Sequence, residues 1–190
     1  MLTSRNGLGR LRAAAARLNP DLIASGEGGS NLTLVRPRGT LGAIEERRGL
    51  AIHEGRPERR AMALTRTASG VCVANLHATN DVPELAVEDV LRAAEAATEF
   101  AGEAPLLFGG DPNLRPRQNP EVFEQLDERF GLGEPTGPTA IDHLLGRGLS
   151  AVEPVRAWAP ERRELKESGL ALRLSDHAPV EARFETGAAR

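Results

Sequence analysis

The sequence is poor in several residues that mark particular protein classes. It contains one cysteine, one tryptophan, no tyrosine and five phenylalanines in 190 residues. A single cysteine excludes an internal disulfide, and its position in the strand-like run Gly70–Ala74 predicts an inert, buried thiol. The shortage of aromatic rings leaves little for stacking nucleobases, which is how many proteins hold single-stranded nucleic acid.

Long apolar stretches are also missing. No run approaches the roughly 18 residues that a membrane span needs, and no charged-then-apolar signal segment opens the chain. We therefore predict no membrane span and a cytoplasmic location, with an export signal upstream of Met1 as the alternative. The composition, 40% hydrophobic and 27% charged, is typical of globular proteins. The length suits one domain over residues 1–190, ending in a frayed tail at Glu185–Arg190.

Charge is distributed unevenly along the chain. Residues 1–60 hold 11 arginines and 6 acidic residues, for a net charge of +5, and the remainder carries −8, which together give −3. The basic part gives mild support for an anionic ligand near the N-terminal half. The acidic remainder argues against a dedicated duplex-DNA enzyme, whose binding face is strongly basic.

Hydrophobic periodicity predicts an α+β fold. Helical spacing appears at Leu8–Leu18, Val87–Phe100 and Glu121–Phe130. Strand patterns bounded by turn residues appear at Asp21–Ala24, Asn31–Arg36, Leu50–His53, Ala61–Thr67, Val71–Leu76, Pro105–Phe108, Ala140–Leu145, Val152–Ala157 and Pro179–Phe184. The order of these elements favours a layered α/β sandwich of two packed, mostly antiparallel sheets flanked by helices.

Polar side chains follow several of these strands where each strand ends. The apolar run at Leu106 leads through two glycines, read as a tight turn, to Asp111 and Asn113. Three similar clusters are Asn75-Leu76-His77, Ile141-Asp142-His143 and Ser175-Asp176-His177. Each is ordinary alone, because Gly-Gly-Asp is more often a turn than a site and an Asp beside a His is often a surface pair. Their combination predicts one shared pocket.

Carboxylates, carboxamides and imidazoles in one pocket suit the hydrolysis of phosphate esters. A carboxylate can hold a divalent cation, another can act on the attacking water, and imidazoles can stabilise charge on the phosphoryl oxygens. No phosphate-binding Walker loop, serine nucleophile elbow or Cys-x-x-Cys pair competes with this interpretation. A zinc site built from the four histidines is disfavoured, because no close-spaced pair of ligands is present.

The four clusters, in this order, resemble the endonuclease/exonuclease/phosphatase superfamily of metal-dependent phosphodiesterases, which has nuclease, sphingomyelinase and inositol-phosphatase branches. The resemblance covers roughly residues 20–184. The motifs that carry it are Asn75-Leu-His77 (Asn-x-His), Gly110-Asp-Pro-Asn113 (Gly-Asp-Phe-Asn, with Pro112 replacing the aromatic residue), Ile141-Asp-His143 (Ile-Asp-His/Tyr), Ser175-Asp-His-Ala-Pro-Val180 (Ser-Asp-His-x-Pro-Val) and the Gly29-Ser-Asn31 turn.

The resemblance implies a catalytic role for five residues. Asp111 would orient or deprotonate the attacking water, with Asn113 in support. His177 would contact the scissile phosphate while held by Asp142, and His77 would be a second imidazole on the phosphate. His143 follows Asp142 directly, so alternation along a strand places it on the opposite face, outside this set.

The resemblance also implies a metal and a substrate pocket. Asp176 would help bind Mg²⁺ or Mn²⁺, and Asn31 and Asn75 would line the substrate pocket. The substrate would be a phosphate ester, which leaves nucleic acid, a phospholipid head group or a small phosphodiester open.

The sequence departs from the family at its beginning. Family members start with a strand ending in Asn and a strand ending in Gln-Glu, whose Glu is the principal metal ligand, and neither is found here. Met1–Leu18 resembles the helix that follows those strands. We expect the fold to be N-terminally shortened, with further protein upstream of Met1. The alternative is a catalytically weak or inactive member that acts as a binding or interaction domain and self-associates through an exposed sheet edge.

Overall fold

The computed structural model describes residues 31–54, 59–167, 170–173, 175 and 177–186. The elements, in chain order, are β1 (Ile44–His53), β2 (Arg60–Thr67), β3 (Cys72–His77), α2 (Pro83–Ala101), β4 (Leu106–Asp111), α3 (Pro120–Phe130), β5 (His143–Arg147), β6 (Leu149–Ala151), β7 (Arg156–Ala157), the 3₁₀ helix η3 (Pro160–Arg163), β8 (Glu164–Glu167), β9 (Leu170–Arg173), β10 (Val180–Glu181) and β11 (Phe184–Thr186).

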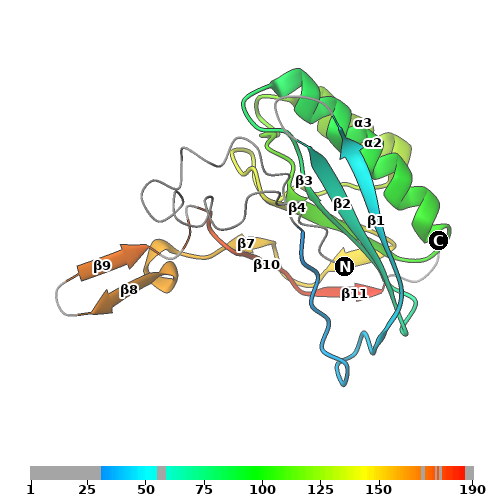
Figure 1. The fold of residues 1–190 in the computed structure, drawn as a ribbon, viewed down its shortest axis with the longest axis horizontal. Helices are drawn as coiled ribbons and strands as arrows, with labels where there is room; N and C mark the ends of the chain where they lie inside the picture. Colours follow the sequence, from blue (N-terminus) through cyan, green and yellow to red (C-terminus); the bar gives the residue numbers. More distant parts are fainter. Residues whose placement is uncertain (1–30, 55–58, 168–169, 174, 176, 187–190) are drawn as a thin grey trace, which may run out of the picture.

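A five-stranded sheet in the order β1-β2-β3-β4-β5 forms the centre of the molecule (Figure 1). Its neighbouring strands are antiparallel except for the parallel pair β3 and β4. A parallel pair needs a crossover connection, and α2 provides it. Among the described residues, three two-stranded sheets accompany the central one: β6 with β11, β7 with β10, and β8 with β9.

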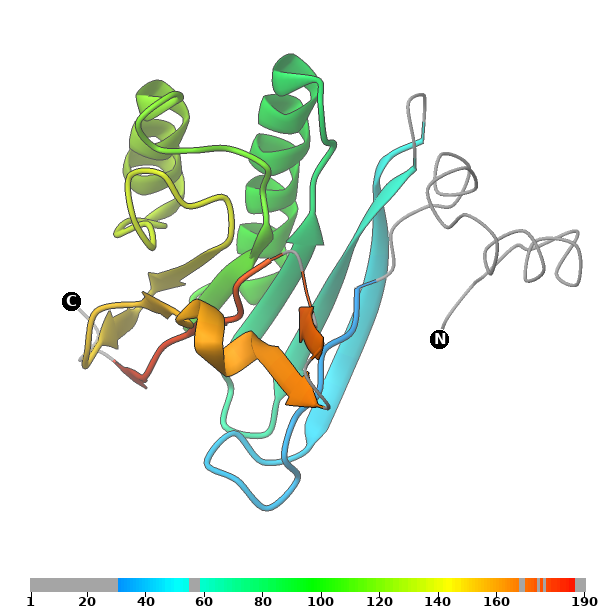
Figure 2. The same cartoon turned by 90° about the vertical axis from the view of Figure 1, so that its left-hand side faces the viewer.

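The molecule is layered around this sheet. The helices α2 and α3 cover one face, and the short pairs β6–β11 and β7–β10 lie on the other side (Figures 1 and 2). The α+β class predicted from the sequence is confirmed. The second sheet of the expected sandwich is represented, within the described ranges, by these short strand pairs.

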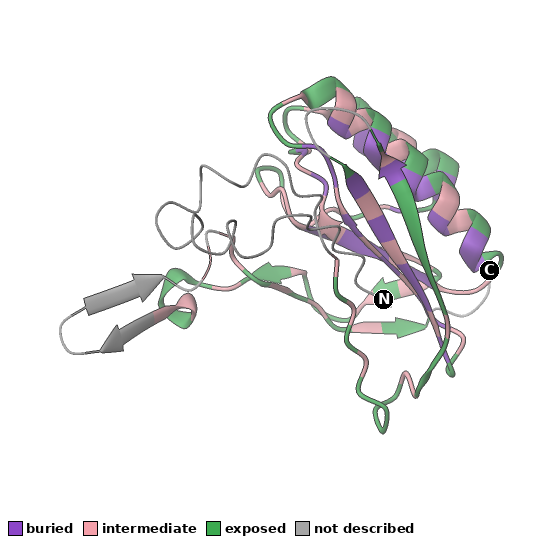
Figure 3. Ribbon diagram, viewed as in Figure 1, coloured by how far each residue is buried: buried purple, intermediate pink, exposed green. Residues whose placement is uncertain are grey.

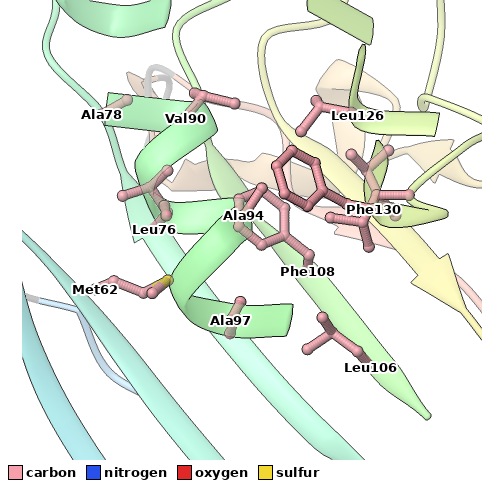
Figure 4. Packing of buried hydrophobic residues seen from close by; sticks show 14 of the residues in the cluster. Met62, Leu76, Ala78, Val90, Ala94, Ala97, Leu106, Phe108, Leu126 and Phe130 are labelled. Atoms are coloured by element: carbon pink, nitrogen blue, oxygen red, sulfur yellow. The ribbon is translucent and has the colours of Figure 1, made fainter. Parts of the chain in front are cut away.

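The hydrophobic core lies between the central sheet and the helices (Figure 3). Alternate residues of the strands face the helices and are buried, and small residues on α2 allow the helix to lie close to the sheet. Figure 4 shows Phe108 of β4 surrounded by side chains from α2 and α3. Burial of this apolar surface is the main force that fixes the sheet beneath the site. The largest members on the strands are Ile52, Met62, Leu64, Leu76, Leu106, Phe108 and Leu145.

The helices begin and end where the sequence provides the right residues. Proline occupies the first turn of both helices, at Pro83 and Pro120, a position where its missing N–H has no intrahelical partner to lose. Gly131 follows α3 with φ +67° and donates its N–H to the carbonyl oxygen of Asp127 at 2.8 Å. Glycine is favoured there because it adopts positive φ without steric cost.

Several expected strands differ from those observed. Pro154 interrupts the strand expected over Val152–Ala157, because proline cannot donate to a strand ladder, and β6 and β7 lie on either side of it. The strand expected at Pro179–Phe184 is divided into β10 and β11. The frayed tail was placed too early, because Glu185 and Thr186 belong to β11 and pair with β6.

The N-terminal part of the described chain also differs from expectation. Residues Asn31–Arg36 have no strand assignment, and side-chain amides rather than a ladder tie this segment to the sheet, as described below. Strand β1 begins at Ile44 rather than Leu50. The helix expected at Leu8–Leu18 and the strand expected at Asp21–Ala24 lie outside the described residues.

The outer strand β1 carries consecutive charged residues, Glu45 to Arg48, and is largely exposed. Charges on an edge strand oppose pairing with another chain. Self-association through this edge stays a prediction, and these charges disfavour it. Within the described part of the chain, no helix combines the length and apolarity that crossing a bilayer requires.

Candidate active site at the strand ends

The pairing of β3, β4 and β5 brings three polar strand ends to one edge of the sheet. In the parallel pair, His77 at the end of β3 lies in register with Asp111 at the end of β4. In the antiparallel pair, Gly110 lies opposite His143 at the start of β5. Asp142 immediately precedes β5, so it reaches the same edge.

These residues surround a cavity of about 380 Å³. Six of the site residues predicted from the sequence line it, and Ser175 and Pro179 contribute part of its wall. The predicted site residues in the lining are Asn31, Asn75, His77, Asp111, Asp142 and His177. Asn113 lies behind Asp111, and Asp176 is outside the described residues. The structure thus brings the set together, and the role of each residue stays a prediction.

Asp111 is held by the turn that follows it. Its Oδ1 accepts the backbone N–H of Asn113 at 3.0 Å, and Asn113 has φ +55°, which asparagine tolerates better than most residues. The Nδ2 of Asn113 donates to the carbonyl oxygen of Ala78 at 3.1 Å, and Ala78 donates its N–H to the carbonyl oxygen of Asp111 at 2.9 Å. Asn113 therefore fixes the carboxylate and ties its turn to the end of β3.

The other oxygen of Asp111 faces two imidazoles. Its Oδ2 lies 3.6 Å from Nε2 of His77 and 3.9 Å from Nε2 of His177. Both distances exceed that of a direct hydrogen bond, so a water or substrate oxygen can bridge Oδ2 and either imidazole. The arrangement suits a reaction in which a carboxylate acts on water while imidazoles contact the group under attack.

His177 is paired with Asp142. Its Nδ1 lies 2.9 Å from Oδ2 of Asp142, and its backbone N–H donates to Oγ of Ser175 at 3.2 Å. The bond to Asp142 fixes the ring orientation and places the proton of Nδ1 on the carboxylate side, so that Nε2 faces the cavity. An N–H on Nε2 can donate to an anionic oxygen in the cavity.

Asn31 and Asn75 line the cavity and also bind backbone. Nδ2 of Asn75 donates to the carbonyl oxygen of Leu32 at 3.2 Å, and Nδ2 of Asn31 donates to the carbonyl oxygen of Ala61. These bonds anchor the segment that begins at Asn31 across β2 and β3. Hydrogen bonds from side-chain amides therefore bind Asn31–Arg36 to the sheet, where the sequence predicted a strand.

The two glycines before Asp111 lie inside β4 rather than in a turn. A Cβ on Gly109 would lie 2.6 Å from the carbonyl oxygen of His143, and one on Gly110 would lie 2.0 Å from that of Leu76. Both positions need glycine because neighbouring strands approach too closely for any side chain. This close approach holds Asp111 beside the end of β3 and the start of β5.

Burial raises the pKa of the Asp111 carboxyl above its ordinary value, and the negative charge of Asp142 adds to this. The N–H of Asn113 and the two imidazoles act in the opposite direction without cancelling the effect of burial. A raised pKa makes the ionised carboxylate a stronger base toward water.

Asp111→Asn is expected to raise the thermal stability of the metal-free protein at pH 8. The pKa of Asp111 is raised in the folded state. Its favourable contribution to folding stability is therefore complete below the ordinary pKa near 3.8, and it is lost as the pH rises through the folded pKa. At pH 8 the buried carboxylate is thus a net cost, which the amide removes while still accepting the Asn113 N–H.

Thermal unfolding in EDTA at pH 4 and pH 8 measures this effect. The stability advantage of the variant over the wild type should be larger at pH 8 and small at pH 4. A variant that is less stable than the wild type at pH 8 would show that the contacts of the carboxylate with His77 and His177 outweigh the effect of burial.

Asp111, Asp142 and His177 each offer a ligand atom, and these atoms lie within 4.8 Å of one another. Two carboxylates at the wall of an open cavity fit a small divalent cation, because Mg²⁺ binds through one or two carboxylates and keeps several waters. Two carboxylates and one imidazole are ligand types that several divalent cations accept.

His143 was placed by alternation on the face opposite Asp142, and its ring lies there, against Phe123 of α3 with 5.0 Å between the ring centroids. Sequence reasoning did not identify the hydrogen bonds of this ring, which are described below. It also missed Leu144 and Val180 in the cavity wall. Apolar residues at strand positions carry no signal that separates a cavity wall from core.

No protein-family model and no curated protein matches the sequence significantly. Solved structures do match its fold. An endonuclease/exonuclease/phosphatase family protein from Bacteroides thetaiotaomicron has a TM-score of 0.56 at 14% identity, over 74% of this chain and 64% of that one. A mannosyl-6-phosphatase from the same species has a TM-score of 0.54 at 14% identity, over 75% and 66%.

TDP2 from D. rerio, solved with a single-stranded DNA product, has a TM-score of 0.53 at 12% identity, over 76% of this chain and 68% of that one. The chain spans about two thirds of the length of these proteins. At this level of identity the likeness concerns the fold. The chain therefore has the fold of the endonuclease/exonuclease/phosphatase proteins.

Proposed function

We propose that this chain is a metal-dependent phosphoesterase of the phosphodiesterase or nuclease type, which uses a water activated by Asp111. The observation that carries the proposal is the position of the Asp111 carboxylate, whose Oδ2 lies within 3.9 Å of Nε2 of both His77 and His177. This constellation lines an open cavity at the strand ends of a fold that phosphoesterases share.

In the proposed reaction, Asp111 accepts a proton from water as the water oxygen forms a bond to phosphorus. The bond between phosphorus and the leaving oxygen breaks, the leaving oxygen takes a proton from solvent, and Asp111 returns its proton to solvent. The imidazole of His177, oriented by Asp142, donates to a phosphoryl oxygen on which negative charge increases, and His77 does so from the other side.

Asp111 and Asp142 would hold the divalent cation, together with Asp176 if the resemblance extends to it. When bound, Mg²⁺ or Mn²⁺ would polarise a phosphoryl oxygen and neutralise part of the charge that develops there. The cation would also offset the repulsion between two carboxylates at the same cavity.

The substrate we propose is a small phosphate ester or a single-stranded nucleic acid. A cavity of about 380 Å³ lies at the lower end of the range for small-molecule sites, so it accommodates one phosphoryl group with one attached moiety. The fold neighbours include a mannosyl-6-phosphatase and a TDP2 bound to single-stranded DNA product, which supports testing sugar phosphates, short oligonucleotides and phospholipid head groups.

The test is hydrolysis of bis(p-nitrophenyl) phosphate and p-nitrophenyl phosphate. We expect turnover of at least one ester with Mg²⁺ or Mn²⁺, and loss of turnover in EDTA that is restored by adding the metal back. Hydrolysis that continues unchanged in EDTA would contradict the metal-dependent mechanism.

A chain that binds phosphate esters without turning them over would instead be a binding or interaction domain. Isothermal titration with a non-hydrolysable phosphorothioate diester separates this outcome from a complete lack of binding. In a binding domain, affinity should be insensitive to the metal, whereas in the proposed enzyme the metal should increase it.

A further inference from the structure

The buried imidazole of His143 connects three segments beside the site. The residue is 1% exposed. Its Nδ1 accepts the backbone N–H of Thr136 at 3.2 Å, and its Nε2 lies 3.2 Å from the carbonyl oxygen of Leu114. Its ring also packs edge-on against Phe123. A single side chain thus holds the turn after β4, the loop before β5 and helix α3.

The hydrogen bonds define which nitrogen carries the proton. A backbone N–H can only donate, so Nδ1 is the acceptor and the proton is on Nε2, where it donates to Leu114. The neutral ring therefore satisfies the buried carbonyl oxygen of Leu114 and the part-buried N–H of Thr136, and leaving either unpaired would be costly.

Leu114 and His143, which this hydrogen bond joins, each directly follow a residue of the site. Leu114 directly follows Asn113, whose backbone N–H binds Asp111. His143 directly follows Asp142, which binds His177. The distance between the water-handling carboxylate and the phosphate-facing imidazole therefore depends on how firmly the turn after β4 is held to the start of β5.

We propose that His143 is a positioning residue for the phosphoesterase site, acting from behind the sheet by fixing the Asp111 turn against the Asp142–His177 pair. This rests on the proposed function of that site. His143 is among the residues that line the cavity, but both of its ring nitrogens are taken by the backbone of Thr136 and Leu114, so it acts through the geometry of the reacting groups. Displacement of a reacting group by about 1 Å can cost on the order of a hundredfold in rate.

Three substitutions separate the two hydrogen bonds from packing. His143→Phe keeps an aromatic ring beside Phe123 and removes both bonds. His143→Gln keeps a donor near the Nε2 position for Leu114, and His143→Asn keeps an acceptor near Nδ1 for Thr136. We expect kcat to fall about ten- to a hundredfold in His143→Phe with KM changed less than about threefold, and His143→Gln to recover more activity than His143→Asn.

Leu145→Ala is the matched control, because Leu145 lies on the same face of β5, is fully buried and makes no link to the Asp111 turn. It should lower thermal stability and leave kcat within about threefold at a temperature where it is folded. Equal kcat losses in Leu145→Ala and His143→Phe, or no recovery in His143→Gln, would overturn the positioning role.

A second measurement does not depend on turnover. Backbone amide exchange of Asn113 and the ¹⁵N imidazole signals of His177, assigned with His177→Ala, report the two halves of the site directly. Both should change in His143→Phe and stay as in the wild type in Leu145→Ala. Unchanged signals would overturn the inference, whereas changed signals with an inactive wild type would leave it standing and reject the proposed enzymatic activity.

Discussion

His177→Ala is expected to lower kcat/KM for phosphate-ester hydrolysis by about 10²- to 10⁴-fold, the usual range for a positioned imidazole that donates to charge in the transition state. The loss should appear mainly in kcat, because the phosphoryl oxygens carry more negative charge in the transition state than in the bound ester. Steady-state kinetics at saturating Mg²⁺ or Mn²⁺ measure it.

Asp142→Asn tests whether Asp142 acts through His177. An amide at this position keeps the size of the side chain but removes the negative charge beside Nδ1 of His177, and we expect a loss of about ten- to a hundredfold. Because the two residues act as a unit, the double variant should be little worse than His177→Ala alone. Because the metal is saturating in these assays, additive losses would show that Asp142 acts on catalysis mainly through the cation it would hold, and not through His177.

His53→Ala is the control for these variants. His53 also lies beside a carboxylate, with its Nδ1 3.7 Å from Oδ1 of Asp89, but it does not line the cavity. Its activity should remain within about threefold of the wild type. A loss as large as that of His177→Ala would contradict the location of the site.

The sequence was most informative where a polar residue directly follows a buried strand. His77 and Asp111 each end an apolar run, so their positions at the same edge follow once β3 and β4 are recognised as a parallel pair. The α+β class and both described helices were predicted for the same reason, because hydrophobic periodicity reflects burial against one core. Six of the residues predicted from these patterns line one cavity.

Sequence patterns failed where tertiary contacts decide. The segment after Asn31 alternates like a strand, but the amides of Asn31 and Asn75 bind backbone where ladder bonds were expected. Two consecutive glycines predict a turn, but Gly109 and Gly110 lie inside β4. The sequence does not show how closely the neighbouring strands approach them. The ring of His143 bonds the backbone of Thr136 and of Leu114, which lies 29 residues away in the sequence, and only the fold brings these groups together.

The close approach at Gly110 leads to the largest stability effect that we expect. In Gly110→Ala, the new Cβ would lie 2.0 Å from the carbonyl oxygen of Leu76, and the residue would keep a φ of +118°. The carbonyl cannot move without breaking the pairing of β3 with β4. We expect a loss of about 2–6 kcal/mol from backbone strain and overpacking, which lowers Tm by roughly 5–20 °C in a chain of this size.

Gly70→Ala separates the clash from the backbone angle. Gly70 also has a positive φ, +83°, but a Cβ there would meet nothing within 4 Å, so only the strain of the backbone remains, about 1 kcal/mol. Thermal unfolding of the two variants should therefore differ by several degrees, and Gly110→Ala should also lose activity, because Asp111 is the next residue. Equal Tm losses in the two variants would mean that β3 and β4 can separate locally, and that the spacing of His77 and Asp111 is not set by the strand pair.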